Sequence, residues 1–469
     1  MIINKTAKVV IVGSLVSALY SQQVMAAGFA LIENSASGMG NAFAGGSAIA
    51  EDASTVWFNP AGMTRLKGDQ ISVTGHIISP SAEFSDNGSN IGANGGGAPL
   101  SGNVDDGGIN ALVPNFYYVT QLEGNAWFGL GVTVPFGLST DYEDDWIGRY
   151  HATLSEVKTI NINPSFAFKF KDDLSVGLGL NLQYIEATLE NKIDSALTCV
   201  GLQTNTSQDP RDCVPNAVIP GGTGSLVPGL ASQDSSQSLT ADDWNIGWNI
   251  GLLYDLDGES RLGVAYRSSM DANLSGDVKF TVDPAFQTII DSNPVVPKFL
   301  SNTGIMAGIE LPAQLSVSYV RDIDSKLTVM ADVTWTEWSN FDALVIKFDN
   351  LQQSTSNQPE NWEDSYRYAL GANYQYTDKF ILRFGVAHDQ TPISSAEERT
   401  ARIPGDDRRW VSLGVGYEMD SSTSIDVGYS HLFVDDTKIN NTVPKSGQIL
   451  LGEYNADVNI LSVQGNFKF

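Results

Sequence analysis

The sequence predicts an all-β membrane protein, namely a 14-stranded antiparallel outer-membrane β-barrel with an N-terminal hatch in its lumen. Three observations predict it: apolar residues alternate with small ones along most of the chain, short turns alternate with long loops, and charge is scarce. Charged residues make up 17% of the 469 residues, below the roughly 25% of an ordinary soluble domain. Glycine, with 45 residues, and aromatic residues, at 10%, are plentiful.

The first 26 residues are predicted to be a secretory signal peptide. Lys5 and Lys8 precede an apolar run from Val9 to Leu19, and small residues lead to Ala26. Basic, apolar and cleavage regions in this order are typical of export signals. We expect cleavage after Ala26, with Ala27 as the new amino terminus. A membrane anchor is the alternative, but the apolar run is too short for one.

From about residue 68 onward the chain shows the period-two pattern of β-strands. Between Leu174 and Tyr184 the even positions are Leu, Val, Leu, Leu, Leu and Tyr, and the odd positions are Ser, Gly, Gly, Asn and Gln. A soluble sandwich would present Lys, Glu and Thr on its second face. Gly, Ser, Ala and Asn instead suit the inside of a barrel whose apolar face meets lipid. Only a closed barrel satisfies every backbone polar group of a sheet in a bilayer.

The turns predict the number of strands. Short polar turns are predicted at 123–125, 171–173, 257–259, 322–325, 377–379 and 420–422. Long Gly-, Asp- and Asn-rich loops are predicted near 85–108, 138–153, 191–242, 281–309, 349–361, 391–407 and 435–449. Six short turns and seven long loops separate 14 strands, which is the pattern of periplasmic turns and extracellular loops. The last strand alternates up to Phe469, and we expect the barrel assembly machinery to recognise it.

Residues 27–67 do not alternate and precede the predicted barrel of residues 68–469. They are rich in Gly and Ala, with short helices expected around Gly40–Ala50. Because a 14-stranded barrel has a lumen wider than its own side chains can fill, we expect this segment to form a hatch inside it. The alternative, a disordered periplasmic tail, fits poorly with the large apolar residues Phe43, Ile49, Trp57 and Phe58.

The two cysteines are expected to form a disulfide. Cys199 and Cys213 lie 14 positions apart in a loop of small and polar residues, and export leads to an oxidising compartment. Closing a loop of this length contributes roughly 3 kcal/mol on the chain-entropy model. A two-Cys metal site is the weaker alternative, because no His lies nearby. We expect no metal and no cofactor.

The charge balance and the motifs exclude some functions. Lys and Arg number 27 against 54 Asp and Glu, a formal net charge of −27, and nucleic-acid binding requires a surplus of basic side chains. No G-x-S-x-G motif occurs and no Cys/His spacing suits a metal, so we expect no catalytic residues. The alternatives from other classes are an outer-membrane lipid hydrolase, a general porin, and a structural barrel or phage receptor.

Several segments, in a fixed order along the chain, carry a resemblance. They are AGFALIENSASGMGNAFAG at 27–45, AEDAS at 50–54, Asn59-Pro60-Ala61, GWNIGLLYDLDGESRLGVAYRS at 247–268, WTEWSNF at 335–341, SYRYALGANYQYTDKFILRFGVAHDQTP at 365–392 and IPGDDRRWVSLGVGY at 403–417. With these the chain resembles the FadL-type long-chain fatty acid transporters of Gram-negative outer membranes, a family that includes aromatic hydrocarbon channels. The similarity covers nearly all of the mature chain outside the long loops.

The resemblance implies passive uptake of a hydrophobic substrate. Extracellular loops capture the substrate, which passes to a pocket over the hatch and leaves sideways into the bilayer, without ATP or proton motive force. Long-chain fatty acids are the first expectation, and aromatic or alkane hydrocarbons are the alternative. The chain is expected to act as a monomer.

The third predicted strand carries a candidate lateral gate. Pro135 cannot donate to the sheet ladder, and proline within a strand belongs at an edge or a bulge, so we expect a kink and a gap in the wall. In the family this kink forms the exit beside the Asn-Pro-Ala of the hatch. The gate is therefore assigned to Asn59, Pro60, Ala61, Val134, Pro135, Phe136 and Gly137. The alternative is that Pro135 already lies in the extracellular loop.

The resemblance also implies a ligand pocket. Ala27, Gly28 and Phe29 match hatch positions that face the ligand in the family, and the amino group of Ala27 could meet a carboxylate. Fatty acid transporters of the family carry basic residues on the fifth strand beyond a shared Tyr, here Tyr184. This chain instead has Glu186, Thr188, Glu190 and Asn191, with Lys192 displaced. The departure leaves room for an uncharged or aromatic ligand.

One extracellular segment is a candidate for substrate capture. Trp146, Arg149 and Tyr150 follow the acidic run DYEDD at 141–145, and an Arg among aromatic residues suits an external capture site or a contact with lipopolysaccharide. The acidic run could bind Ca²⁺, but its spacing is irregular and a solvated surface is the favoured interpretation.

Overall fold

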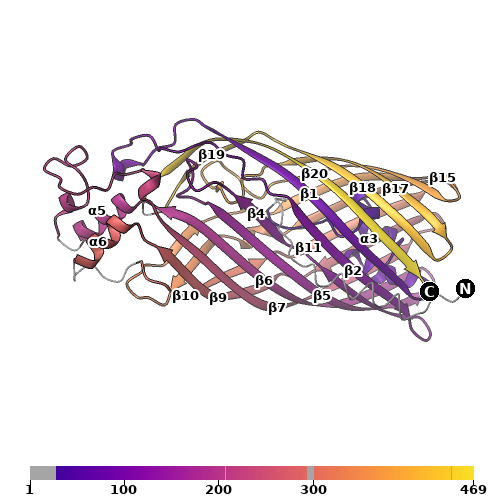
Figure 1. The fold of residues 1–469 in the computed structure, drawn as a ribbon. Helices are drawn as coiled ribbons and strands as arrows, with labels where there is room; N and C mark the ends of the chain where they lie inside the picture. The colour runs from indigo at the N-terminus through magenta and orange to yellow at the C-terminus, as the bar shows by residue number, and fades with distance from the viewer. Residues whose placement is uncertain (1–27, 206–207, 293–299, 445) are drawn as a thin grey trace, which may run out of the picture.

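The computed structural model describes residues 28–205, 208–292, 300–444 and 446–469. The predicted signal peptide and Ala27 lie outside the described residues. Twenty strand segments form one sheet, drawn in Figure 1. They are β1 (Gln70–Asp86), β2 (Ala111–Gln121), β3 (Ala126–Thr133), β4 (Gly137–Asp141), β5 (Leu154–Lys171), β6 (Leu174–Ile193), β7 (Ser235–Asp255), β8 (Ser260–Arg267), β9 (Met270–Thr281), β10 (Thr303–Leu311), β11 (Gln314–Asp322), β12 (Leu327–Thr336), β13 (Ala343–Phe348), β14 (Ser356–Pro359), β15 (Ser365–Thr377), β16 (Phe380–Asp389), β17 (Arg408–Asp420), β18 (Thr423–Val434), β19 (Thr437–Thr442) and β20 (Ile449–Lys468).

These segments combine into a 14-stranded antiparallel barrel, as predicted. Six barrel strands are interrupted once and so consist of two segments each: β3 with β4, β8 with β9, β10 with β11, β12 with β13, β14 with β15, and β18 with β19. All six predicted short turns lie between strands. Five predicted loops are too long. In 191–242 and 281–309, β6 continues to Ile193, β7 begins at Ser235 and β10 begins at Thr303. The predicted loops 138–153, 349–361 and 435–449 contain most of β4, all of β14 and all of β19.

The ring closes between its first and last strands. β1 pairs with β20 along all 17 of its residues, from Gln70 opposite Lys468 to Asp86 opposite Gly452. The outward positions are apolar and exposed, as the alternation predicted: Leu178 is 55% exposed and Trp244 59%. Among the described residues, no helix is long and apolar enough to cross a bilayer.

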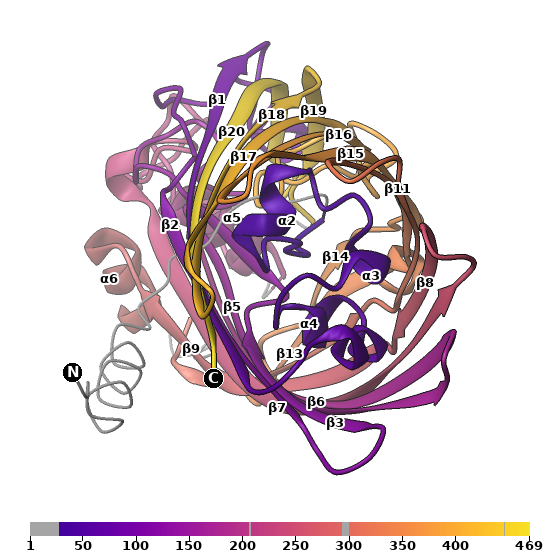
Figure 2. The ribbon, with the colours of Figure 1, turned by 90° about the vertical axis from the view of Figure 1, so that its right-hand side faces the viewer.

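The hatch lies inside the ring, as Figure 2 shows, and its helices are short. They are α2 (Ala36–Gly40), α3 (Gly46–Ile49), α4 (Thr55–Phe58) and the 3₁₀ helix η2 (Pro60–Arg65). The predicted helical region around 40–50 is interrupted, because Ala42 and Phe43 adopt positive φ angles of 53° and 54°, which an α-helix cannot contain. The remaining 3₁₀ helices of the described chain are η3 (Ala93–Gly95), η4 (Pro210–Asp212), η5 (Ala231–Gln233) and η6 (Trp338–Asn340).

Inward-facing glycines make room for the hatch. A Cβ at Gly251 would overlap the side chain of Asn59, and one at Gly263 would overlap the carbonyl of Ser47. The glycines on the inner face of the barrel therefore let hatch backbone lie directly against the wall, which a larger residue would prevent.

Polar contacts fix the hatch to the wall. Arg383 on β16 forms ion pairs with Asp426 of β18 at 2.7 Å and with Glu51 of the hatch at 3.3 Å. The Ser47 hydroxyl donates to that of Ser316 at 2.7 Å. Buried charges of this kind are retained only when they are paired, so the hatch and the wall depend on each other.

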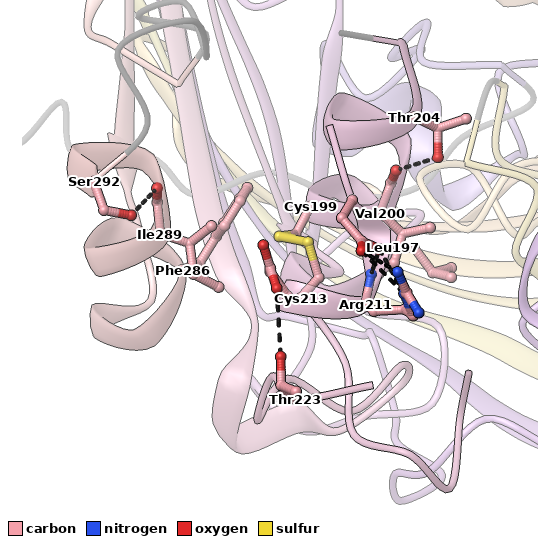
Figure 3. The surroundings of a disulfide bond; sticks show 12 residues. Leu197, Cys199, Val200, Thr204, Arg211, Cys213, Thr223, Phe286, Ile289 and Ser292 are labelled. Carbon is pink, nitrogen blue, oxygen red and sulfur yellow. Dashed lines mark hydrogen bonds and ion pairs between the residues drawn. A yellow bond between two sulfur atoms is a disulfide. The ribbon is translucent and has the colours of Figure 1, made fainter. Parts of the chain in front are cut away.

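An extracellular cap is held by the predicted disulfide (Figure 3). Cys199 of helix α5 (Ser195–Asn205) bonds to Cys213 with a Cα–Cα distance of 5.8 Å. The bond packs in a small apolar cluster with Leu226 and with Phe286 of helix α6 (Pro284–Ser292), separate from the clusters in the barrel. The disulfide therefore closes part of one extracellular loop, and the cluster around it joins this loop to the one that contains α6.

Replacing both cysteines by serine is expected to open this cap and leave the barrel intact. The loss removes a loop constraint of roughly 3 kcal/mol from a cluster that the barrel does not share. Proteinase K added to whole cells should cleave loop 195–234 at least several-fold faster in the double variant. Heat-modifiable migration in gels should stay that of the parent protein. Equal protease resistance of both proteins would contradict the assignment.

Candidate functional site

The third barrel strand is broken at the position of the predicted kink. β3 ends at Thr133 and β4 begins at Gly137, and both segments pair with β5. On the other side β2 pairs only with β3, from Phe116 to Gln121. Residues 111–115 of β2 therefore have β1 as their only strand neighbour among the described pairings. Pro135 lies within the wall, between two segments of one strand, and not in the extracellular loop.

The backbone of the break is hydrogen-bonded to the hatch. Leu31 N donates to the carbonyl of Pro135 at 2.8 Å, and Gly137 N donates to the carbonyl of Phe29 at 2.8 Å. Side chains of the neighbouring strands complete the set, because the amides of Val134 and Phe136 donate to Asn115 Oδ1 and Thr159 Oγ1. Hatch residues 29–31 thus occupy the place that β2 would fill in an unbroken wall.

The Asn-Pro-Ala segment lies against different strands. Asn59 Nδ2 donates to the carbonyl of Leu252 on β7 at 2.9 Å and to that of Ser47 at 2.6 Å, while its Oδ1 accepts from Ala61 N at 3.0 Å. Ala61 shares an apolar cluster with Val134. The residues that bond directly to the break are 29–31, and Asn59 instead anchors the hatch to β7.

Phe29 lies at the centre of an aromatic cluster. Its ring centroid is 4.8 Å from that of Trp338, 5.9 Å from those of Phe136 and Trp362, and 6.0 Å from that of Phe341. Gly28 has a φ of 62° and its missing Cβ would contact Trp338 and Trp362 at less than 3 Å, so no larger residue fits there. Gly28 and Phe29 thus belong to an apolar cluster beside the break, their part in a ligand pocket stays a prediction, and Ala27 lies outside the described residues.

The aromatic partners come from interruptions of the barrel strands. Trp338 and Phe341 lie between β12 and β13, and Trp362 lies between β14 and β15. In the sequence, WTEWSNF is recognisable only as a family motif. Two aromatic residues at a point where a barrel strand should continue could also have indicated an apolar cluster inside the barrel. Pro114 on β2 was missed as well, and proline within a sheet marks an edge, which is what residues 111–115 form.

A cavity of about 110 Å³ lies between the hatch and the wall. We call it the hatch cavity. Hatch residues 30–33 and 57–58 form one side, and the other side carries both apolar and charged residues: Asn249, Arg267, Ser316, Asp332, Trp338, Arg367, Asp389, Arg408 and Trp410.

A second cavity, of about 250 Å³, lies among the extracellular ends of the strands and the loops. Lys192 and Arg402 line it with Glu360. Lys192 is paired with Asp144 at 2.7 Å. Burial lowers the pKa of Arg402 to about 10 and raises the pKa of Glu360 to about 8. Glu360 is thus mostly protonated at neutral pH, and Arg402 remains charged.

The predicted capture residues are buried. Trp146 and Arg149 are 0% exposed and Tyr150 is 3% exposed. Arg149 pairs with Asp234 at 2.6 Å and also donates to the carbonyls of Ser101 and Gly229, so it joins three extracellular loops. In this structure Trp146 and Arg149 hold the loops together, and of the three residues Tyr150 lines a cavity; their part in substrate capture stays a prediction.

The fifth-strand residues beyond Tyr184 form local contacts. The Tyr184 hydroxyl donates to Glu186 at 3.1 Å, and Glu190 accepts from the Ser238 hydroxyl at 2.7 Å. Across the described ranges, no group of three His, Cys, Asp or Glu side chains is placed to hold a metal ion.

Comparisons with known proteins agree with this architecture. The model of the family described as "Outer membrane protein transport protein (OMPP1/FadL/TodX)" matches residues 17–469. The long-chain fatty acid transport protein of Escherichia coli O6:H1 is 30% identical over 418 residues, which are 88% of this chain and 89% of the relative.

Solved structures are similar as well. A FadL homologue of Pseudomonas aeruginosa superposes with a TM-score of 0.81 at 25% identity, over 94% of this chain and 99% of the other. The toluene transporter TodX of Pseudomonas putida has a TM-score of 0.65 at 17% identity, over 94% and 99% of the two chains, and shows the fold alone. The broken third strand, the hatch and the family match together assign this chain: it belongs to the FadL/TodX family of outer membrane transport proteins, which carry hydrophobic compounds and are not enzymes.

Proposed function

We propose that this protein takes up long-chain fatty acids passively across a Gram-negative outer membrane and releases them sideways through the broken third strand. The observation that carries the proposal is the break itself, where hatch residues 29–31 stand in for a strand neighbour of residues 135–137. Two backbone hydrogen bonds to the hatch are far easier to exchange than a continuous ladder between β2 and a full third strand.

Two features favour a lateral route over a vertical one. The hatch fills the lumen and is fixed to the wall by contacts such as the ion pair of Arg383 with Glu51, so a path straight through would have to disrupt them. A fatty acid also gains about 0.8 kcal/mol for each CH₂ group removed from water. Release into the hydrocarbon layer keeps that gain, whereas release into the aqueous periplasm would forfeit it. The filled lumen likewise argues against a general porin.

Long-chain fatty acids are favoured over aromatic hydrocarbons by the relatives. The E. coli fatty acid transport protein aligns with 88% of this chain, and the FadL homologue superposes better than the toluene transporter. Aromatic or alkane hydrocarbons are the second candidate, supported by the aromatic cluster around Phe29 and by the acidic residues that replace basic ones beyond Tyr184.

Other expectations from the sequence stay predictions. They are export through a cleaved signal peptide of residues 1–26, the domain limits 27–67 and 68–469, recognition of the last strand by the barrel assembly machinery, contacts with lipopolysaccharide, and a monomeric state.

The gate is tested by a charge at Val134. This side chain is 3% exposed and lies beside the break, so Val134→Arg would place an unpaired guanidinium on an apolar path. Because burying such a charge costs several kcal/mol, we expect uptake of radiolabelled oleate by whole cells to fall at least about tenfold. Val134→Leu, which keeps the apolar character, should retain uptake. Normal uptake by a correctly folded, heat-modifiable Val134→Arg protein would refute an exit at this position.

The substrate is tested by deleting the gene in its host. Growth on oleate as sole carbon source should be impaired and restored by the intact gene, while growth on toluene or alkanes should not change. The opposite pattern would favour the hydrocarbon alternative. Unimpaired growth on oleate in a host that has no second family member would count against fatty acid uptake.

A further inference from the structure

The hatch cavity contains a buried arginine without a carboxylate partner. Arg267, at the end of β8, is 8% exposed. Its guanidinium lies over the ring of Trp57, 3.6 Å from the centroid, and donates to the carbonyl of Trp57 at 2.9 Å and to Asn181. No Asp or Glu of the described residues lies within 4.0 Å of its nitrogens. A buried charge that lacks a counter-ion is costly, so this position requires an explanation.

Two more arginines line the cavity. Arg408 forms an ion pair with Asp389. Arg367 has no carboxylate of the described residues within 4.0 Å either, but it interacts electrostatically with Asp389, Asp332 and Glu33, whereas no described Asp or Glu interacts in this way with Arg267.

Asn249 lies directly opposite Arg267 in the register of β7 and β8. Its Oδ1 accepts from the Nδ2 atoms of Asn163 and Asn181 at 2.9 and 3.1 Å, which fixes the orientation of the amide. Its own Nδ2 is buried, belongs to a residue that lines the cavity, and has no acceptor among the described residues. A guanidinium and an amide NH₂ group, side by side, thus present hydrogen-bond donors and positive charge to the cavity.

A row of polar side chains connects this pair to the broken strand. Asn161 on β5 donates to Asn181 on β6 at 3.2 Å and to Thr133, the last residue of β3, at 3.5 Å. Asn181 and Asn249 then lead to Arg267, so the row crosses five neighbouring barrel strands. A polar group that moves along this row keeps hydrogen-bond partners between the cavity and the break.

From these contacts we propose that Arg267 and Asn249 bind the carboxylate of an anionic amphiphile in the hatch cavity. A carboxylate supplies both the missing counter-ion and the missing acceptor, in a charge-assisted hydrogen bond. With about 110 Å³, the cavity is much smaller than pockets that enclose a whole drug-sized ligand, so it holds the head group and the first methylenes. The assignment rests on fatty acid uptake as the proposed function and names the residues that recognise the acid.

The proposal is tested by comparing an acid with a neutral ligand of the same chain. Binding of oleate and of oleyl alcohol to the purified full-length protein in a non-ionic detergent is measured by quenching of tryptophan fluorescence. The parent protein should prefer oleate. Asn249→Asp, an isosteric change that gives Arg267 an internal counter-ion, should weaken oleate binding at least about tenfold and leave binding of oleyl alcohol within about twofold.

Two further variants complete the test. Arg267→Met should also lose the preference for the acid, whereas Arg65→Met, which removes a hatch guanidinium paired with Asp255 outside the cavity, should keep it. Because Arg267 packs on Trp57, the Arg267→Met variant is compared only if heat-modifiable migration shows that its barrel is folded. If it does not fold, Asn249→Asp still tests the proposal.

The possible failures are distinguishable. If the parent prefers oleate and Asn249→Asp keeps that preference, the cavity holds only water and the proposed head-group site is wrong, while fatty acid uptake stands. If the parent binds oleate and oleyl alcohol equally, the head-group site is wrong as well, and fatty acid uptake is then decided by growth on oleate alone; if the parent does not bind oleate, both proposals fall.

Discussion

Every backbone polar group that lies within a bilayer must find its partner inside the protein, and this constraint organises the whole structure. The antiparallel barrel satisfies it by closing β1 onto β20. It would be violated beside Pro135, where the third strand breaks and residues 135–137 lose β2 as their neighbour. There the hatch supplies partners to Pro135 and Gly137 through Leu31 and Phe29. The N-terminal segment is therefore part of the hydrogen-bonding wall as well as an obstruction of the lumen, and any movement of it changes the wall and the lumen together.

The inside of the barrel is adapted to this second role. Glycines such as Gly251 and Gly263 allow backbone-to-wall contact, and most of the charges on the hatch and its surroundings occur in pairs, as Arg383 does with Asp426. Arg267 departs from this pattern. A cation that interacts with no carboxylate, beside an amide NH₂ group that lacks an acceptor among the described residues, is better explained by a ligand than by packing, because packing alone would favour a neutral residue at that position.

Much of the fold and part of the site could be predicted from the sequence. The period-two alternation and the turn spacing predicted 14 strands because both are local properties, and Pro135 predicted the break because a proline restricts its own position in a ladder. The partners of the break could not be predicted, since Phe29 and Leu31 meet residues about 100 positions away. The burial of Arg149 was missed for the same reason: Ser101, Gly229 and Asp234 come from loops far apart in the chain. Arg267 looks like any other strand arginine until its surroundings are known.

The pairing of β1 with β20 also bears on the order of assembly. The hatch precedes β1 directly, and the closing pair joins residues 70–86 to residues 452–468, the most distant contact that the chain can make between its barrel strands. Contacts of such large sequence separation form slowly. Because the hatch is joined directly to β1, the segment that fills the lumen and the seam that closes the wall are tied together in the chain. The barrel strand that is synthesised last therefore completes the wall beside the strand to which the hatch is attached.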